Sequence, residues 1–246
     1  SSFGCNAGAF TTTGSNNTAL GSQALRANTT ASNNTALGFQ AGYSNTTAAN
    51  NSFVGFAVGY ANTTGTENVG VGGQGASSNT TLRFNTTGSS NTAIGIGALQ
   101  ANTTASQNTA VGNLAGYNNT TAVDNSFFGQ NAGYSCTEGF SNTFIGRAAG
   151  YYVTTGDGNT FIGGGVSGSQ FSAGFYVTTG SKNTIVGNYN GNQGGLDIRA
   201  TDNYIVLSDG DGNPRLFMTN NGYIHSDPTY ANTSGGTANV GIASSG

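Results

Sequence analysis

Residues 91–108 read Asn-Thr-Ala-Ile-Gly-Ile-Gly-Ala-Leu-Gln-Ala-Asn-Thr-Thr-Ala-Ser-Gln-Asn, and the last asparagine opens the same pattern again. This framing asparagine recurs every 17 residues in two runs, at Asn17, Asn34, Asn51 and Asn68 and then at Asn91, Asn108, Asn125, Asn142 and Asn159. A fixed period of this size indicates one structural unit that is stacked many times. The sequence therefore predicts a rod, and rods display or connect things more often than they catalyse reactions.

The composition of the repeat predicts its local structure. We number repeat positions from the framing asparagine as position 0. Position 2 is mostly Ala or Phe, position 3 is aliphatic or Phe, position 4 is Gly, position 7 is small and apolar, position 9 is often Tyr, and positions 12 and 13 are mostly Thr-Thr. This pattern predicts two short strands in each coil, at positions 1–4 and around positions 6–10, with corners at the glycine and at the Asn-Thr-Thr stretch. We expect an all-β chain that forms a parallel β-solenoid or flattened β-roll with 17-residue coils, because helical solenoids have repeats of about 30 residues or more.

Positions 2 and 3 are both apolar, although neighbouring residues of a strand point to opposite faces. One of these faces can fill the core of the roll, and the other then needs a cover. A partner chain is the simplest cover, so we expect an oligomer, with three subunits around one axis. The alternative is an exposed ladder formed by Phe53, Phe127, Phe144 and Phe161.

The framing asparagine suggests a structural role. We expect its side-chain amides to stack into a hydrogen-bonded ladder along the roll. The alternative is that it binds a ligand, although it is repeated in every coil.

Two long intervals interrupt the repeat inside a shaft that we assign to residues 1–202. Asn68 to Asn91 is 23 residues and Asn159 to Asn183 is 24, which places insertions near residues 73–85 and 164–175. Insertions in a solenoid leave its side as loops. The candidate receptor contacts are therefore Arg83, Phe84, Phe171 and Phe175, and the alternative is that these loops are ornamental or pack between subunits.

Residues 203–246 form a second unit, in which the frame fades. The sequence predicts strands at 203–208, 215–219 and 223–225, with turns between them, and one more strand near 238–242, which together make a short β-meander. The turn at Asp209-Gly210-Asp211-Gly212-Asn213 resembles the start of a calcium loop, but Asn220 stands where the loop needs an acid. We therefore interpret it as a plain turn.

Composition excludes several functions. The net charge is −3 with no basic stripe, which argues against nucleic-acid binding, and no apolar run approaches the ~20 residues of a membrane helix. Cys5 and Cys136 are about eight repeats apart, too far for a disulfide. Ser1-Ser2-Phe3-Gly4 reads as the tail of a repeat, so we expect the chain to begin inside a larger protein, and it shows no signal peptide.

The unit at 91–104 resembles the repeats of phage tail-fibre and tail-spike proteins, and its Ala-Ile-Gly core is similar to the β-roll heads of trimeric autotransporter adhesins. The stretch at 208–215 with the following Asn-Gly-Tyr-Ile resembles the segment before the endosialidase-type intramolecular chaperone of such fibres. The resemblance implies a left-handed coil, a homotrimer, an extended shaft on a virion tail or cell surface, and contact with a host-surface glycan or protein receptor. It also implies other fibre or tail proteins on the N-terminal side, and a C-terminal chaperone that is absent here.

The residue types that commonly act in catalysis are not clustered in this sequence. His225 is the only histidine, and the acids Glu67, Asp124, Glu138, Asp157, Asp197 and Asp202 occupy unrelated positions. We expect a structural fibre or adhesin protein that is not an enzyme and has no catalytic, cofactor-binding or metal-binding residues. Two alternatives stay open, namely a monomeric ice-binding solenoid with a Thr ladder, and a glycan-degrading spike whose sites are shared between chains.

Overall fold

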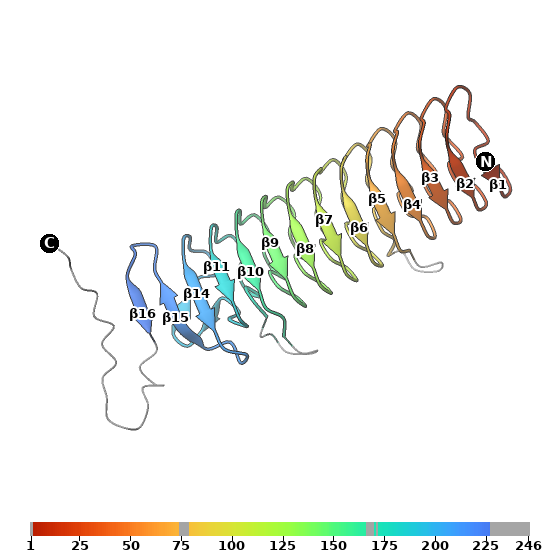
Figure 1. Cartoon of the computed structure of the whole chain (residues 1–246). Helices are drawn as coiled ribbons and strands as arrows, with labels where there is room; N and C mark the ends of the chain where they lie inside the picture. The colour runs from red at the N-terminus through yellow and green to blue at the C-terminus, as the bar shows by residue number, and fades with distance from the viewer. Residues whose placement is uncertain (1, 74–78, 166–169, 171, 227–246) are drawn as a thin grey trace, which may run out of the picture.

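A computed structural model describes residues 2–73, 79–165, 170 and 172–226. These residues form an all-β structure without helices (Figure 1). The strands are β1 (Ser2–Phe3), β2 (Thr18–Leu20), β3 (Thr35–Leu37), β4 (Ser52–Val54), β5 (Val69–Val71), β6 (Thr92–Ile94), β7 (Thr109–Val111), β8 (Ser126–Phe128), β9 (Thr143–Ile145), β10 (Thr160–Ile162), β11 (Thr184–Val186), β12 (Asn192–Gln193), β13 (Leu196–Asp197), β14 (Ile205–Ser208), β15 (Pro214–Met218) and β16 (Ile224–Ser226).

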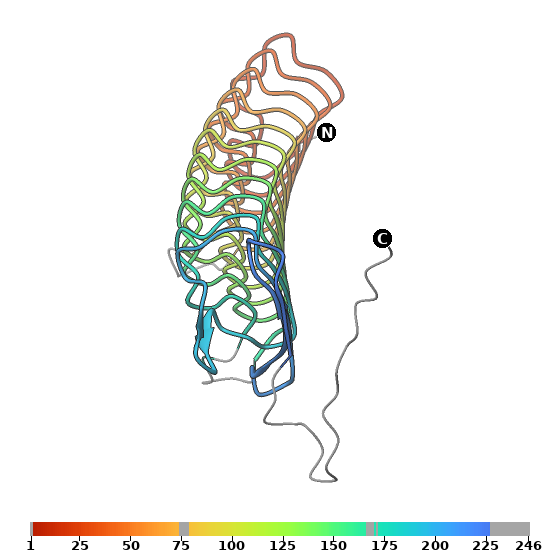
Figure 2. The same ribbon diagram turned by 90° about the vertical axis from the view of Figure 1, so that its left-hand side faces the viewer.

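The chain forms a parallel β-solenoid, as the 17-residue period predicts. Strands β1 to β11 pair in parallel in chain order, and each residue faces its counterpart in the next coil, for example Ala93 with Ala110 and Ile94 with Val111. Figures 1 and 2 show the coils as a gently curved stack, with β1 at one end and β16 near the other. At ~4.8 Å per strand, the ten steps from β1 to β11 span roughly 50 Å.

The prediction of a second strand around positions 6–10 is wrong, because the described coils have turns there. Residues at positions 6 and 8 have left-handed backbone angles, such as Gln23 with φ 61°, Leu25 with φ 48° and Ala148 with φ 55°. An extended strand cannot contain such angles. Each regular coil is therefore one three-residue strand followed by a long series of tight turns.

The core of the roll is filled by positions 2, 7 and 8 of successive coils. Phe53, Phe127, Phe144 and Phe161 at position 2 have no exposed surface, so the alternative of an exposed Phe ladder is wrong. The rings of Phe127 and Phe144 lie 5.7 Å apart, and those of Phe144 and Phe161 lie 5.0 Å apart.

Large side chains at position 2 are matched by glycine at position 8. All four coils with Phe carry Gly there, and the coils with Leu at position 8 carry Ala or Gly at position 2. A Cβ built on Gly133 would lie 2.4 Å from the Phe127 ring, so the two positions share one volume. The repeat keeps its core close-packed by exchanging volume between strand and turn.

The glycine at position 4 is required by contact between coils. Gly21 has φ 130°, and a Cβ there would lie 2.5 Å from the carbonyl oxygen of Gly38. Glycine alone permits both the backbone angle and this close approach. The predicted corner after each strand is therefore confirmed.

The predicted amide ladder at position 0 is present. The Oδ1 atom of Asn125 accepts a hydrogen bond from the main-chain N–H of Asn142 at 2.9 Å, and its Nδ2 donates to the Gly139 carbonyl at 2.9 Å. A second ladder, which we did not predict, runs along position 11, where Asn102 Nδ2 donates to Asn85 Oδ1 at 2.6 Å and to the Ala105 carbonyl at 3.0 Å. These buried amides satisfy main-chain groups at the corners of the coils.

The C-terminal strands continue the same sheet, as the predicted meander requires. β14 pairs in parallel with β11, β15 and β16 follow in antiparallel order, and β12 with β13 forms a separate short hairpin. The strand predicted near 238–242 lies outside the described residues. Cys5 is exposed, Cys136 is buried, and both are free thiols.

Candidate functional site

The outward face of the long sheet carries a continuous row of apolar side chains at position 3. We call this set the outer row, and its members are Leu20, Leu37, Val54, Val71, Ile94, Val111, Phe128, Ile145, Ile162, Val186 and Leu207. The strands turn position 2 inward and position 3 outward, and nine members of the outer row are 37–49% exposed. Mostly Thr and Ser stand beside it at position 1. A two-sided apolar strand therefore leaves one apolar face open along the whole stack.

Aromatic side chains form a second surface at position 9, on the turn side of the coils. We call Tyr43, Tyr60, Tyr117, Tyr134, Tyr151 and Phe175 the aromatic ladder. Tyr117 stacks on Tyr134 with centroids 5.1 Å apart, Tyr134 on Tyr151 at 4.9 Å, and Tyr151 on Phe175 at 5.1 Å. Burial raises the pKa of the Tyr151 phenol, and the neighbouring tyrosines add to the effect.

The candidate contacts near the two insertions lie in different places. Arg83 and Phe84 fall at positions 9 and 10 counted back from Asn91, so they belong to a regular coil. The guanidinium of Arg83 lies 5.7 Å from the centroid of Tyr60 and 5.6 Å from that of Phe84. Phe175 is likewise a regular position-9 residue, and Phe171 lies outside the described residues.

The structure does not bring Arg83 and Phe84 near Phe175. Arg83 and Phe175 are five coils apart, roughly 24 Å at the spacing of stacked strands. The frame counted back from Asn91 and Asn183 places Arg83, Phe84 and Phe175 in regular coils beside the insertions, and their role as receptor contacts stays a prediction. Phe175 lines a pocket.

That pocket has a volume of about 280 Å³ and lies beside the second insertion. Its described lining combines aromatic rings, amides and one cation, from Asn131, Arg147, Ala148, Tyr151, Tyr152, Gln170 and Phe175. Tyr152 is 43% exposed and meets Tyr151 edge to face at 4.8 Å. Sequence reasoning missed Arg147, Tyr151 and Tyr152, although the recurring tyrosine at position 9 was visible in the sequence.

Threonines at positions 12 and 13 have different environments. The hydroxyl at position 12 is bonded within the protein, as when Thr103 Oγ1 donates to the Thr120 carbonyl at 3.1 Å. Thr104 at position 13 is exposed, as are its counterparts in the neighbouring coils. The Thr-Thr stretch therefore offers one outward rank of hydroxyls.

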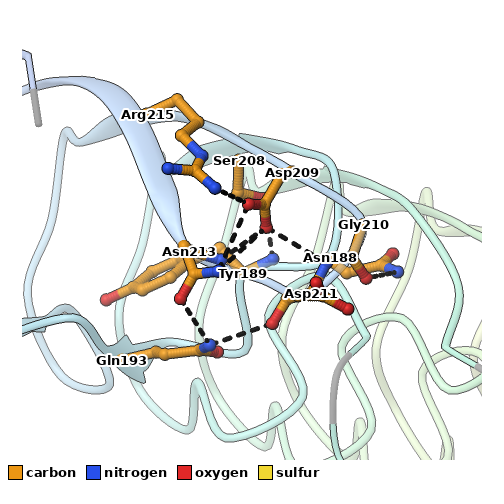
Figure 3. A network of polar contacts seen from close by, with 9 residues as sticks. All are labelled: Asn188, Tyr189, Gln193, Ser208, Asp209, Gly210, Asp211, Asn213 and Arg215. Carbon is orange, nitrogen blue, oxygen red and sulfur yellow. Dashed lines mark hydrogen bonds and ion pairs between the residues drawn. The ribbon is translucent and has the colours of Figure 1, made fainter. Parts of the chain in front are cut away.

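The turn at 209–213 is held by protein groups (Figure 3). Asp209 Oδ1 accepts hydrogen bonds from the main-chain N–H groups of Asp211 at 3.0 Å and Asn213 at 2.9 Å, and Oδ2 pairs with Arg215. Partial burial acts to raise the pKa of the Asp209 carboxyl, but the hydrogen bonds from Asn213 and Arg215 outweigh it and lower the pKa to about 2. The carboxylate is thus occupied by donors of its own chain, as in a plain turn.

The same network connects this turn to Asn188, which follows β11, and to Gln193 in β12. Gln193 Nε2 donates to the Asp211 carbonyl at 2.9 Å, and Asn188 Nδ2 donates to the Gly210 carbonyl at 2.7 Å (Figure 3). The contacts fasten the last coil to the antiparallel strands.

The described part of the chain holds no group of three or more His, Cys, Asp or Glu residues placed to bind a metal ion. It also contains no helix of the length and apolar character needed to cross a membrane.

Comparisons with protein-family models, with curated proteins and with solved structures gave no match.

Proposed function

We propose that this chain is a shaft segment of an elongated fibre or adhesin, assembled as a homotrimer through the outer row and displayed on a virion tail or cell surface. The observation that carries the proposal is the outer row itself. It continues over eleven strands, from Leu20 in β2 to Leu207 in β14. Soluble monomers rarely expose an apolar patch of this extent.

The arrangement of the row supports burial between identical chains. A continuous row on one face of a sheet can meet the same row of another copy along its length, and each added coil adds the same contact. Sheets packed face to face lie ~10 Å apart, a distance that aliphatic side chains fill. The number three comes from the resemblance to trimeric fibres, as do the host-surface receptor and the fibre or tail proteins expected on the N-terminal side.

A pair of matched substitutions tests the proposal. Ile145→Lys places a charge in the outer row, whereas Thr155→Lys places the same charge at an exposed position 13 of the same coil. Burying an unpaired charge between sheets is costly. Sedimentation velocity should show that Ile145→Lys dissociates into monomers at concentrations where the wild type and Thr155→Lys stay associated. Equal behaviour of the two variants would contradict the proposed interface.

The shaft role predicts particles of a defined shape. Negative-stain electron microscopy of the wild type should show short rods, in which the repeat region contributes roughly 50 Å of length. Compact round particles would argue against a shaft.

A further inference from the structure

The pocket beside the aromatic ladder has the chemistry of a sugar-binding site. We propose that it binds a pyranose unit that carries a carboxylate, with Arg147 holding the carboxylate and Tyr152 supporting the face of the sugar ring. The inference rests on the proposed adhesin for its biological use, and it names the ligand class of that adhesin. The pocket itself is built by a single chain.

Tyr152 lines the pocket and is 43% exposed. One face of its ring lies parallel to Tyr176, with centroids 6.0 Å apart and planes inclined by 3°. One coil earlier, the residue at the position of Tyr152 is Ser135, which has no ring to stack on it. The negative face of an aromatic ring attracts the weakly positive C–H groups on the flat side of a pyranose.

Tyr151 and Phe175 hold Tyr152 in place. Tyr151 is itself stacked between Tyr134 and Phe175, at 4.9 and 5.1 Å, so both of its faces are occupied. Tyr152 meets the rings of Tyr151 and Phe175 edge to face, at 4.8 and 5.2 Å. Such a packed support fixes the ring of Tyr152 before any ligand arrives, which lowers the entropic cost of binding.

The described lining of the pocket carries a positive charge. Arg147 is the cation in its described lining, which includes no Asp or Glu. A guanidinium presents paired N–H donors that match the two oxygens of a carboxylate. The amides of Asn131 and Gln170 can both donate to and accept from sugar hydroxyls.

The volume of the pocket limits the size of its ligand. A volume of about 280 Å³ is just below the ~300 Å³ at which pockets for larger ligands begin. The pocket therefore suits one sugar unit of a longer glycan. For one unit we expect a dissociation constant on the order of millimolar.

Two glycosides that differ only at one carbon test the proposal. Methyl α-galacturonoside carries a carboxylate where methyl α-galactoside carries a hydroxymethyl group. Ligand-observed NMR titrations of the full chain should give at least fivefold tighter binding of the acid. A second titration with the methyl glycoside of N-acetylneuraminic acid identifies the kind of glycan that supplies the carboxylate. Tighter binding of this acid indicates a terminal sialic acid, whereas tighter binding of the galacturonoside indicates a uronate polysaccharide.

Three variants assign the roles of the residues. Arg147→Gln should reduce binding of the acid to the level of the neutral sugar, and Tyr152→Ser should weaken both sugars by a similar factor. Lys182→Gln is the control, because it removes one positive charge outside the pocket at a repeat position where Gln107 already stands. It should bind both sugars like the wild type. Circular dichroism checks that each variant is folded.

Any of three results overturns the proposal. The first is that neither acid binds at a concentration 20 times a millimolar dissociation constant, and the second is that the wild type binds the acid and the neutral sugar equally. The third is that folded Arg147→Gln still prefers the acid to the neutral sugar. Failure here is distinct from failure of the fibre proposal, because the oligomeric mass does not depend on Arg147 or Tyr152.

Discussion

Truncation of one framing asparagine tests whether the amide ladder stabilises the rod. Asn91 is fully buried, and its Nδ2 donates to Asn68 Oδ1 at 3.1 Å and to the Ala105 carbonyl at 2.9 Å. Its Oδ1 accepts from the main-chain N–H of Asn108 at 3.1 Å. Asn91→Ala removes all of these contacts without changing the main chain.

The magnitude follows from which groups lose their last partner. The Ala105 carbonyl keeps the hydrogen bond from Asn102 Nδ2 at 3.0 Å, and Asn68 Oδ1 keeps the one from the main-chain N–H at residue 91. The N–H of Asn108 is left buried without an acceptor. An orphaned buried donor costs ~1–3 kcal/mol and the other lost bonds about 1 kcal/mol, so we expect a loss of about 2–4 kcal/mol in the free energy of unfolding.

The assay is urea unfolding of Asn91→Ala beside Asn118→Ala, at one protein concentration because association would add to stability. Asn118 is half-buried at position 10, and its main-chain bond to the Tyr134 carbonyl does not involve the side chain. We expect Asn118→Ala to change stability by less than about 0.5 kcal/mol. Amide hydrogen exchange should also show faster exchange at Asn108 in Asn91→Ala. The reasoning is refuted if both variants are equally stable and Asn108 keeps its protection.

Three further predictions concern the second ladder, the turn and the thiols. Asn119 is buried and neither amide atom of its side chain has a hydrogen-bond partner, so Asn119→Val should raise the free energy of unfolding by about 1 kcal/mol in the same urea experiment. The side chain of Asn62 is hydrogen-bonded, so Asn62→Val should lower the free energy of unfolding by about 2 kcal/mol. The pKa of Asp209 in the folded chain lies below its ordinary value of 3.8, so the contribution of this carboxylate to stability is present above pH 3.8 and is lost as the pH falls through about 2. Thermal unfolding between pH 5 and 2 should therefore show a smaller loss of stability in Asp209→Asn than in the wild type. Equal losses of stability would contradict the role of the turn. Burial raises the pKa of the Cys136 thiol to about 12, so a thiol reagent at pH 8 should label only the exposed Cys5 in the folded chain. Mass spectrometry that finds Cys136 labelled at a similar rate would contradict the described packing.

The sequence predicted what depends on the repeat alone. A period of 17 residues defines the coil, and Asn at position 0 with Gly at position 4 locates its corners. Two apolar neighbours such as Ala93 and Ile94 must face opposite sides of a strand. This alternation predicted one buried row and one outward-facing row of apolar side chains. These features follow from the alternation of side chains and from backbone angles that few residue types allow.

The sequence did not predict the turn side of the coil. Apolar residues at positions 7 and 8 and Tyr at position 9 looked like a strand, but left-handed angles at Leu25 and Ala148 make this segment a turn. Pattern alone does not show such angles, because Leu and Ala rarely adopt them and do so here where the surrounding coils fix the backbone.

The pocket was not predictable for another reason. Arg147 and Tyr152 lie at positions 5 and 10, and the pocket that they line also includes Gln170, which stands outside the regular frame. Counting the frame backward from Asn91 and Asn183 would have shown that Arg83, Phe84 and Phe175 are regular coil residues. The inserted residues themselves carry no period from which a position can be read.

The solution mass of the purified chain, measured by light scattering on a sizing column, tests whether the chains associate through the outer row. We predict a mass near three times the 24.5 kDa of one chain, with the outer row buried between subunits. A mass near 24.5 kDa at micromolar concentrations would contradict it, because the outer row would then face water along the whole rod.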